Sequence, residues 1–177
     1  MDIISNETDR LEIKVMESAD IEEARRLHND DSTLSWLTHQ QHVTEEEQKL
    51  WFASISISKT SRRYVARLKS DREFIGVFRI DGIDQCNRNA LVGADVVGSK
   101  RRLGYATEMF NYFLGYLFNQ CGMHRLALKT MENNEAGKTL YKKLGFVEEG
   151  RERQAILRNG QFWDLVNMSI LESEWRK

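Results

Sequence analysis

The sequence predicts an α+β protein whose sheet is mixed but mostly antiparallel, with about seven strands and about four helices. Short segments with strand-like alternation of apolar and polar residues recur along the whole chain. Longer segments with apolar residues at helical spacing lie between some of them, which gives the order β-α-α-β-β-β-α-β-α-β-β. Because the composition is even and no repeat or flexible linker interrupts it, we expect residues 1–177 to form a single domain.

The N-terminal part of the chain is expected to hold one strand and two helices. Residues 10–16 alternate apolar and polar side chains, as a half-buried strand does. Residues 18–30 place apolar side chains at helical spacing behind an N-cap candidate. After a loop around Trp36, a second helix is expected over residues 44–56, because Thr44 and the acidic residues after it favour a helix start.

Three strands and a long helix are expected in the middle of the chain. Residues 62–69, 73–84 and 90–97 are β-type segments separated by polar turns, which indicates an antiparallel meander. From Gly104 to Gly122 the apolar residues follow a helical period instead. The stripe comprises Ala106, Met109, Phe110, Phe113, Leu114 and Leu117.

The C-terminal part is expected to add a strand, a short helix and a hairpin. Residues 124–131 read as a strand, and residues 134–145 as a helix that begins at an Asn cap and ends at a Gly. Residues 146–171 form two further strand segments, and Asn159-Gly160 between them is a typical hairpin turn.

Charge and composition exclude several classes of function. The 26 basic and 27 acidic residues cancel, so no overall field favours nucleic acid or an anionic membrane, and the three cations Lys100 to Arg102 are too few for a nucleic-acid face. The two cysteines, Cys86 and Cys121, lack the spacing of a disulfide framework or a zinc site. With neither a signal-peptide pattern nor a long apolar run, we expect a cytoplasmic protein without a metal.

A basic loop with two glycines, residues 98–104, stands directly before the long helix. Free N–H groups at a helix start and the helix dipole both favour an anion, so the loop indicates a phosphate site. Neither GxxxxGK[ST] nor GxGxxG occurs in this stretch, and the site is therefore of another kind.

Two ordered motifs give the chain a resemblance to a known family. Residues 101–106, RRLGYA, fit the R/Q-x-x-G-x-G/A signature of the GNAT superfamily of acyl-CoA N-acyltransferases. Asn134 followed by LYKKLGF at 140–146 looks like that family's second signature, N-x-x-A-x-x-L-Y-x-x-L-G-F. Residues 148–175 are similar to the closing hairpin of the subgroup that includes ribosomal-protein N-terminal alanine acetyltransferases.

The resemblance implies three α/β/α layers and an acetyl-CoA-dependent N-acetyltransferase that acts directly on a primary amine. The acceptor is a small-molecule or peptide amine: a protein N-terminus, a polyamine, or an amino sugar, since residues 28–36 and 128–141 also resemble enzymes that acetylate nucleotide-linked sugars. The alternative is a non-catalytic module that binds acyl-CoA. A homodimer is left open.

The resemblance also assigns the donor side of the site. The end of the fourth strand would part from the fifth and bind pantetheine, with an N–H group near Val97 facing the thioester oxygen, and the loop would wrap the pyrophosphate. Asn134 would bind pantetheine, cap its helix, or do both. The expected cofactor-binding residues are Val96, Val97, Arg101, Arg102, Leu103, Gly104, Tyr105, Ala106, Thr107 and Asn134.

The same resemblance makes Tyr141 the acid that protonates the leaving thiolate. The base stays open, because Leu91 and Lys129 stand where some relatives carry glutamate. The conceivable bases are Asp95, Glu132, His39 and His42. Residues expected near the acceptor are His28, Trp36, His39, His42 and Trp51.

Overall fold

The computed structural model describes residues 7–38 and 40–175, and it contains one seven-stranded sheet of strand order β1-β2-β3-β4-β5-β7-β6. Neighbouring strands are antiparallel except for β4 and β5, which are parallel. The mixed, mostly antiparallel sheet predicted from the sequence is therefore confirmed. The strands are β1 Leu11–Val15, β2 Arg62–Leu68, β3 Phe74–Asp84, β4 Asn89–Val96, β5 Arg125–Met131, β6 Val147–Arg158 and β7 Gln161–Leu171.

The described part of the chain contains five α-helices, one more than expected. The helices are α1 Ile21–Asn29, α2 Asp31–Leu34, α3 Glu45–Ser56, α4 Tyr105–Gly115 and α5 Glu135–Lys143. The additional helix is α2, a single turn just before Trp36, where a loop was expected; the Asp30 side chain caps it by accepting from the Thr33 N–H group. The long helix ends differently from the prediction, because Tyr116–Gln120 form a π-helical turn after α4.

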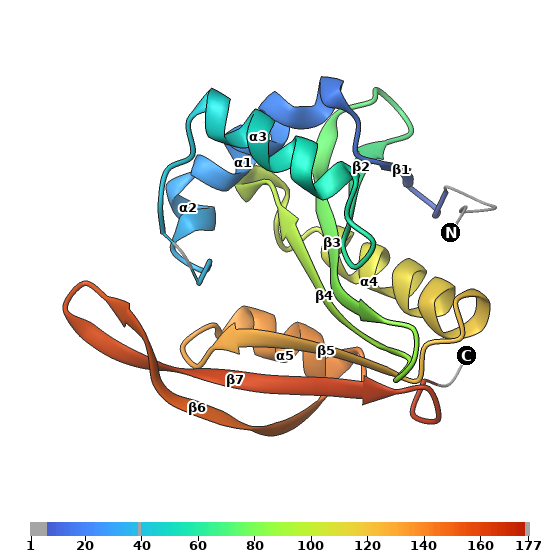
Figure 1. Cartoon of the computed structure of the whole chain (residues 1–177), viewed down its shortest axis with the longest axis vertical. Coiled ribbons are helices and arrows are strands. Elements are labelled where there is room, and N and C mark those ends of the chain that lie inside the picture. The colour runs from blue at the N-terminus through green and yellow to red at the C-terminus, as the bar shows by residue number, and fades with distance from the viewer. Residues whose placement is uncertain (1–6, 39, 176–177) are drawn as a thin grey trace.

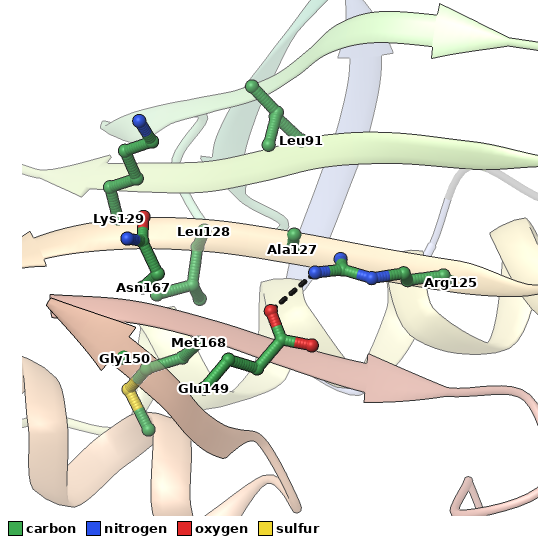
Figure 2. A pocket seen from close by; sticks show the side chains of 9 residues that line it. All are labelled: Leu91, Arg125, Ala127, Leu128, Lys129, Glu149, Gly150, Asn167 and Met168. Atoms are coloured by element: carbon green, nitrogen blue, oxygen red, sulfur yellow. Dashed lines mark hydrogen bonds and ion pairs between the residues drawn. The ribbon is translucent and has the colours of Figure 1, made fainter. Parts of the chain in front are cut away.

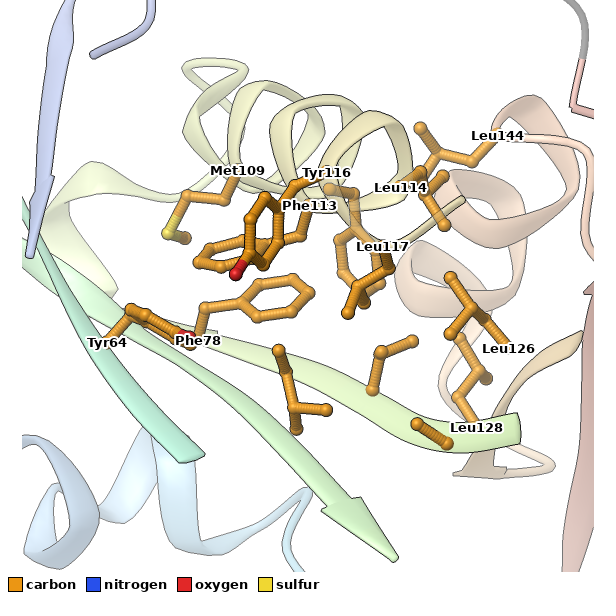
Figure 3. Packing of buried hydrophobic residues seen from close by; sticks show 14 of the residues in the cluster. Tyr64, Phe78, Met109, Phe113, Leu114, Tyr116, Leu117, Leu126, Leu128 and Leu144 are labelled. Carbon is orange, nitrogen blue, oxygen red and sulfur yellow. The ribbon is translucent and has the colours of Figure 1, made fainter. Parts of the chain in front are cut away.

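Helices cover both faces of the sheet, as the α/β/α prediction requires. In Figure 1, α1 and α3 lie on one face, and α4 and α5 lie on the other. The larger core lies under α4, where the Phe113 ring stacks on Phe78 with centroids 3.9 Å apart and also contacts Tyr64 (Figure 3). The predicted apolar stripe of α4 is therefore what attaches this helix to the sheet.

Turn and cap residues set the ends of the elements as their chemistry requires. At α3, Thr44 forms a capping box with Glu47, in which each side chain accepts from the other residue's N–H group. Asn159 and Gly160 have φ angles of 48° and 77°, the two positive values that a tight hairpin turn needs.

The pairing between β4 and β5 is short, and this feature positions the site. It covers Asn89 to Leu91 on β4 and Arg125 to Ala127 on β5, although β4 continues to Val96. Figure 1 shows the two strands meeting at one end and separating toward the other. Beyond Leu91, backbone groups of β4 that face away from β3 therefore lack a strand partner. Of the described helices, none is long and apolar enough to cross a membrane.

Candidate active site

The loop before α4 has the backbone geometry of an anion site. Arg102 and Gly104 have φ angles of 63° and 88°, which fold the loop into a tight turn at the helix start. The N–H groups of residues 102–107 donate to no acceptor among the described residues. Six free donors at the positive end of a helix dipole fit a pyrophosphate, as the sequence predicted.

The three cations in front of α4 have different partners. The Lys100 ammonium group lies 2.6 Å from the Glu73 carboxylate. The Arg101 guanidinium points to α2, where it donates to Ser32 and Thr33, and it also donates to the Val96 carbonyl at 3.0 Å. The Arg101 side chain is thus occupied in tying the loop to α2 rather than free for a ligand.

Arg102 is the cation that stays available. Its side chain is exposed and makes no hydrogen bond or ion pair with any described residue. It is therefore the free side-chain charge nearest to the N–H groups of the loop.

Arg10 supports the loop from the N-terminal segment, and sequence reasoning missed it. Its guanidinium donates to the Leu103 carbonyl at 3.1 Å and lies over the Tyr105 ring, 4.3 Å from the centroid. It also pairs with Glu108 at 2.7 Å. Arg10 and Leu103 are 93 positions apart, so no local spacing signals this contact.

The end of β4 shows which N–H group near Val97 is free. The Val97 N–H group donates to the Ile75 carbonyl at 3.0 Å, so it belongs to the β3–β4 ladder. Because backbone groups alternate between the two neighbours of a strand, the Val96 N–H group points away from β3, into the gap beside β5. Of the two expected residues, Val96 is therefore the one whose N–H group is available to a ligand.

Tyr141 lies on α5 and packs against the core under α4. Its ring packs edge-on against Phe110 and Phe146, with centroid distances of 5.6 and 6.0 Å, so the packing expected of a core tyrosine is present. Its hydroxyl group, however, has no hydrogen-bond partner among the described residues. Burial raises the pKa of Tyr141; the cation of Arg79 counteracts this rise, and the anion of Asp95 adds to it.

Asn134 caps its helix and retains spare capacity. Its side-chain oxygen accepts from the Gly137 N–H group at 3.0 Å, and its amide nitrogen donates to Thr130 at 3.1 Å. A second amide hydrogen remains for a ligand. A Cβ atom at Gly137 would lie 2.6 Å from the Asn134 amide nitrogen, so the Asn134 side chain packs directly against the Gly137 backbone.

Residues 10–147 match the acetyltransferase (GNAT) domain family. The chain belongs to this family. The protein is accordingly an N-acetyltransferase that uses acetyl-CoA to acetylate an amine, and the non-catalytic alternative is not favoured. The loop and the gap beside β4 fit that cosubstrate, because they offer free N–H groups to a pyrophosphate and an unpaired strand edge to a pantetheine arm.

Similar proteins include enzymes with different acceptors. The acetyltransferase is 25% identical to the spermidine N(1)-acetyltransferase of Vibrio cholerae, over 94% of this chain and 95% of that protein. It is 30% identical to the "Putative ribosomal N-acetyltransferase YdaF" of Bacillus subtilis, over 62% of this chain and 60% of that protein.

Solved structures share the fold. A spermidine N-acetyltransferase from Vibrio cholerae in complex with CoA and spermine superposes with a TM-score of 0.89 at 23% identity, over 94% of this chain and 98% of that one. A dodecameric structure of that enzyme has also been solved.

A hollow of about 340 Å³ lies in the acetyltransferase at the junction of β4 and β5, beside the vertex where they separate. Figure 2 shows Leu91 on β4 and Ala127 on β5 in it, with the ion pair between Arg125 and Glu149 at its rim. Lys129 and Asn167 also line it. The hollow is thus a concave surface beside the vertex, open to solvent and lined by both polar and apolar side chains.

The residues expected near the acceptor do not gather in one place. Trp51 packs against a second core cluster under α1 and α3. His28 hydrogen bonds to the Gln41 carbonyl, Trp36 is 43% exposed, and His42 is exposed in a loop. His39 lies outside the described residues.

The conceivable bases Asp95 and Glu132 both have partners. Asp95 is ion-paired with Arg79, and Glu132 accepts a hydrogen bond from the Asp164 N–H group at 2.9 Å. Lys129 stands where some relatives carry glutamate, and it forms an ion pair with Glu152. Among the described residues, no group of three or more His, Cys, Asp and Glu side chains is placed to hold a metal.

Proposed function

We propose that this acetyltransferase acts on the α-amino group of a peptide or protein N-terminus, as its resemblance to ribosomal-protein alanine acetyltransferases implies. One observation carries the proposal: the carboxylate of the hollow is already neutralised. Glu149 is the one carboxylate among the described residues that line the hollow, and it is paired with Arg125 and accepts from the Ser169 hydroxyl. A polyamine with several charges needs unpaired carboxylates, and a peptide α-amine does not.

A second hollow of about 270 Å³ lies between α1 and Val97. Of its two carboxylates, Glu23 is paired with Arg67, whereas Asp30 accepts from the hydroxyl and N–H groups of α2 and keeps its charge. This hollow therefore has one carboxylate without a paired cation, and a polyamine needs several.

The fraction of the amine that is neutral at physiological pH also favours an α-amine as the acceptor. With a pKa near 8, about a quarter of an α-amine is neutral at pH 7.5, whereas only about one alkyl amine in a thousand is neutral with a pKa near 10.4. The two carboxylates that could act as bases, Asp95 and Glu132, have partners of their own. An acceptor that loses its proton to water suits such a site.

On the acetyl-CoA side of the site, we assign roles mainly to the backbone groups that have no partner. The N–H groups of residues 102–107 bind the pyrophosphate, with Arg102 beside them, and Asn134 and the edge of β4 bind pantetheine. The Val96 N–H group stabilises the oxyanion, a contribution of about 3 to 4 kcal/mol in comparable acyl-transfer sites. Tyr141 protonates the departing thiolate.

A polyamine is the second candidate, because the similarity to a spermidine N(1)-acetyltransferase extends over 94% of this chain. The amino-sugar alternative stays a prediction from the sequence alone. The three acceptors differ in charge and in the pKa of the amine, so one assay separates them.

The test is a panel of amines with release of free CoA as the readout. It compares a peptide with a free N-terminal alanine, the same peptide with a blocked terminus and an internal lysine, spermidine, and glucosamine. We expect the free peptide to have kcat/KM at least about 10-fold above the lysine peptide and spermidine, since the neutral fraction alone differs more than this. Glucosamine, whose amine is weakly basic, tests the shape of the acceptor rather than its proton. Faster turnover of spermidine than of the free peptide at equal concentration would overturn the proposal.

Self-association and location stay predictions. The dodecameric neighbour supports assembly of this chain into a homodimer or a larger oligomer, which light scattering on the purified protein measures directly. The cytoplasmic location predicted from the cysteines is tested by fractionation of the cell that makes the protein.

A further inference from the structure

Arg10, the residue directly before β1, contacts three consecutive residues of the loop before α4. Its Nη1 atom donates to the Leu103 carbonyl at 3.1 Å. Its Nη2 atom lies 3.3 Å from the place that a Cβ atom at Gly104 would take, and its guanidinium lies over the Tyr105 ring. The guanidinium is therefore packed directly against the backbone that we expect to bind the pyrophosphate.

Glu108, in the first turn of α4, holds the guanidinium in this place. Its carboxylate accepts from the Arg10 Nε atom at 2.7 Å and from the Arg10 backbone N–H group at 2.8 Å, and the Thr8 hydroxyl donates to it as well. The Glu108 side chain is only 16% exposed, so this pair is held more firmly than an ordinary surface ion pair. One end of the Arg10 fork is thus fixed to α4 while the other end reaches the loop.

The hydrogen bond to the Leu103 carbonyl sets the direction of the next N–H group. The described residues contain no cis peptide bond, so the peptide unit that joins Leu103 to Gly104 is trans. In a planar trans unit the carbonyl and N–H groups point in opposite directions. Because the carbonyl points to Arg10, the Gly104 N–H group points away from it, and it donates to no described residue.

The same peptide unit has a second orientation open to it. The φ and ψ angles of Gly104, 88° and −3°, are those of the third residue of a type II turn. A type I turn differs mainly in that its central peptide unit is roughly reversed, and glycine adopts the backbone angles of both types. In the reversed unit the Gly104 N–H group would face Arg10, a donor that cannot accept it. Glycine therefore permits the observed orientation, and Arg10 selects it.

We propose that Arg10 is a positioning residue for acetyl-CoA: it holds the peptide unit between Leu103 and Gly104 so that the Gly104 N–H group donates to the pyrophosphate. The proposal rests on the role of the loop proposed above. Arg10 belongs to neither family signature and lies 93 positions before Leu103, so it extends the acetyl-CoA site to the N-terminal segment.

This role requires the shape of arginine and not its charge alone. Arg10 uses separate nitrogen atoms for Glu108 and for the Leu103 carbonyl. Lysine carries the same charge as a single ammonium group on a flexible stem, and it cannot hold both partners with the same geometry. Arg10→Lys therefore separates the positioning of a peptide unit from direct attraction of a phosphate.

The experiment measures kcat and KM with acetyl-CoA and with S-acetylpantetheine, which has the same thioester but no pyrophosphate. The acceptor is the best amine of the panel above, at saturation. The variants are Arg10→Met and Arg10→Lys, and in both of them Glu108 keeps the Thr8 hydroxyl and the backbone N–H group of residue 10 as donors.

Arg88→Met is the matched control. Arg88 also donates to a backbone carbonyl, that of Gly122, and also pairs with a glutamate, Glu172, at 3.0 Å. Its side chain is 51% exposed, against 45% for Arg10. Its two partners lie after α4 and after β7 rather than in the loop, so its loss reproduces the cost to stability without touching the acetyl-CoA site.

We expect Arg10→Met to raise KM for acetyl-CoA about 10-fold and to leave kcat within about 2-fold, because a bond to the pyrophosphate is lost and no reacting group is changed. With S-acetylpantetheine, kcat/KM should stay within about 2-fold of the parent. Arg10→Lys should keep at least about a 5-fold rise, and the ratio of each variant to the parent should persist near 1 M salt. Arg88→Met should behave as the parent with both thioesters.

A double substitution tests whether Arg10 acts through the loop backbone. Gly104→Ala disfavours the positive φ and should itself raise KM for acetyl-CoA. Once the peptide unit is misplaced, adding Arg10→Met should change KM by less than about 2-fold, because residues that act as one unit are not additive.

Four results would overturn the inference. They are an equal loss of kcat/KM with both thioesters, a parent-like KM in Arg10→Lys, an effect of Arg10→Met that disappears at high salt, and full additivity with Gly104→Ala. The first would mean general damage to the fold, and the next two would mean direct attraction of phosphate by the charge. If the parent itself has the same KM for acetyl-CoA and S-acetylpantetheine, the proposed role of the loop fails, and this is seen without any change at Arg10.

Discussion

The loop before α4 and the proposed acceptor face around Leu91 are built in opposite ways. The loop consists of consecutive residues, and its binding groups are backbone N–H groups at residues 102–107. The acceptor face takes Arg79, Leu91 and Ala127 from three different strands, and ion pairs hold its charged side chains. The difference teaches that the loop depends on backbone geometry, whereas the face depends on side-chain size and charge.

The largest effect is expected from a backbone change in the loop. Gly104 has a φ of 88°, and a Cβ atom there would lie 3.3 Å from the Arg10 guanidinium. Gly104→Val is strained in this conformation and blocks the approach of phosphate, so we expect the Kd for CoA to rise on the order of 100-fold. Calorimetry with CoA measures it.

The control for this change is Gly115→Ala. Gly115 lies in the same helix without close neighbours, and alanine there should leave CoA binding intact. A folded Gly104→Val variant with the affinity of the parent would show that the pyrophosphate binds elsewhere.

The acceptor face should respond to size instead. Ala127→Phe fills the hollow beside Leu91, and overpacking costs about 2 kcal/mol, so KM for the peptide should rise roughly 30-fold. KM for acetyl-CoA should stay constant, because the donor groups lie elsewhere. Ala155→Phe, at an exposed position of β6, is the control, and initial rates with each substrate varied in turn give both constants. A rise in both KM values would mean that the hollow is not the acceptor's own.

The same contrast explains what the sequence could predict. The order of elements, the sheet type and the loop were predictable, because the hydrophobic period and the two closely spaced glycines are local signals. Arg10 under the loop and Arg79 over Gly93 were not, because strand register and packing bring them there. The choice between the Val96 and Val97 N–H groups was not predictable for the same reason: shifting a register by one residue reverses which N–H group faces a neighbouring strand, and the local pattern does not fix it.

Substitutions of two adjacent cations of the loop should show whether each one acts by holding the loop in place or by its charge. Arg101→Gln removes the hydrogen bonds to Val96 and α2, so the loop loses its anchor, and we expect about a 10-fold rise in the Kd for CoA at any salt concentration. Arg102→Gln removes an exposed charge, and its effect of about 3-fold should vanish near 1 M salt. Titration of CoA at low and high salt decides between them. Equal salt dependence in both variants would mean that Arg101 also acts as a free charge.

The smallest effect is expected beneath the loop, at Glu108. Burial raises the pKa of this carboxyl group, but hydrogen bonds from Thr8 and Arg10 outweigh it, so the pKa lies below its ordinary value of 4.5. A depressed carboxyl pKa stabilises the folded state above the unfolded pKa, and this contribution disappears as the pH falls through the folded pKa. Glu108→Gln should therefore cost about 1 kcal/mol of unfolding free energy at pH 7, and less as the pH drops below 4.5.

Urea unfolding of Glu108→Gln and the parent at pH 7 and in steps below pH 4.5 measures this difference. Glu135→Gln is the control, since Glu135 also lies in the first turn of a helix but is 80% exposed and pairs with Lys138 on the surface, where an ion pair contributes little. A difference between Glu108→Gln and the parent that stays constant across the pH range would arise from packing, because a charge that holds the N-terminal segment to α4 must fade when the carboxylate is protonated.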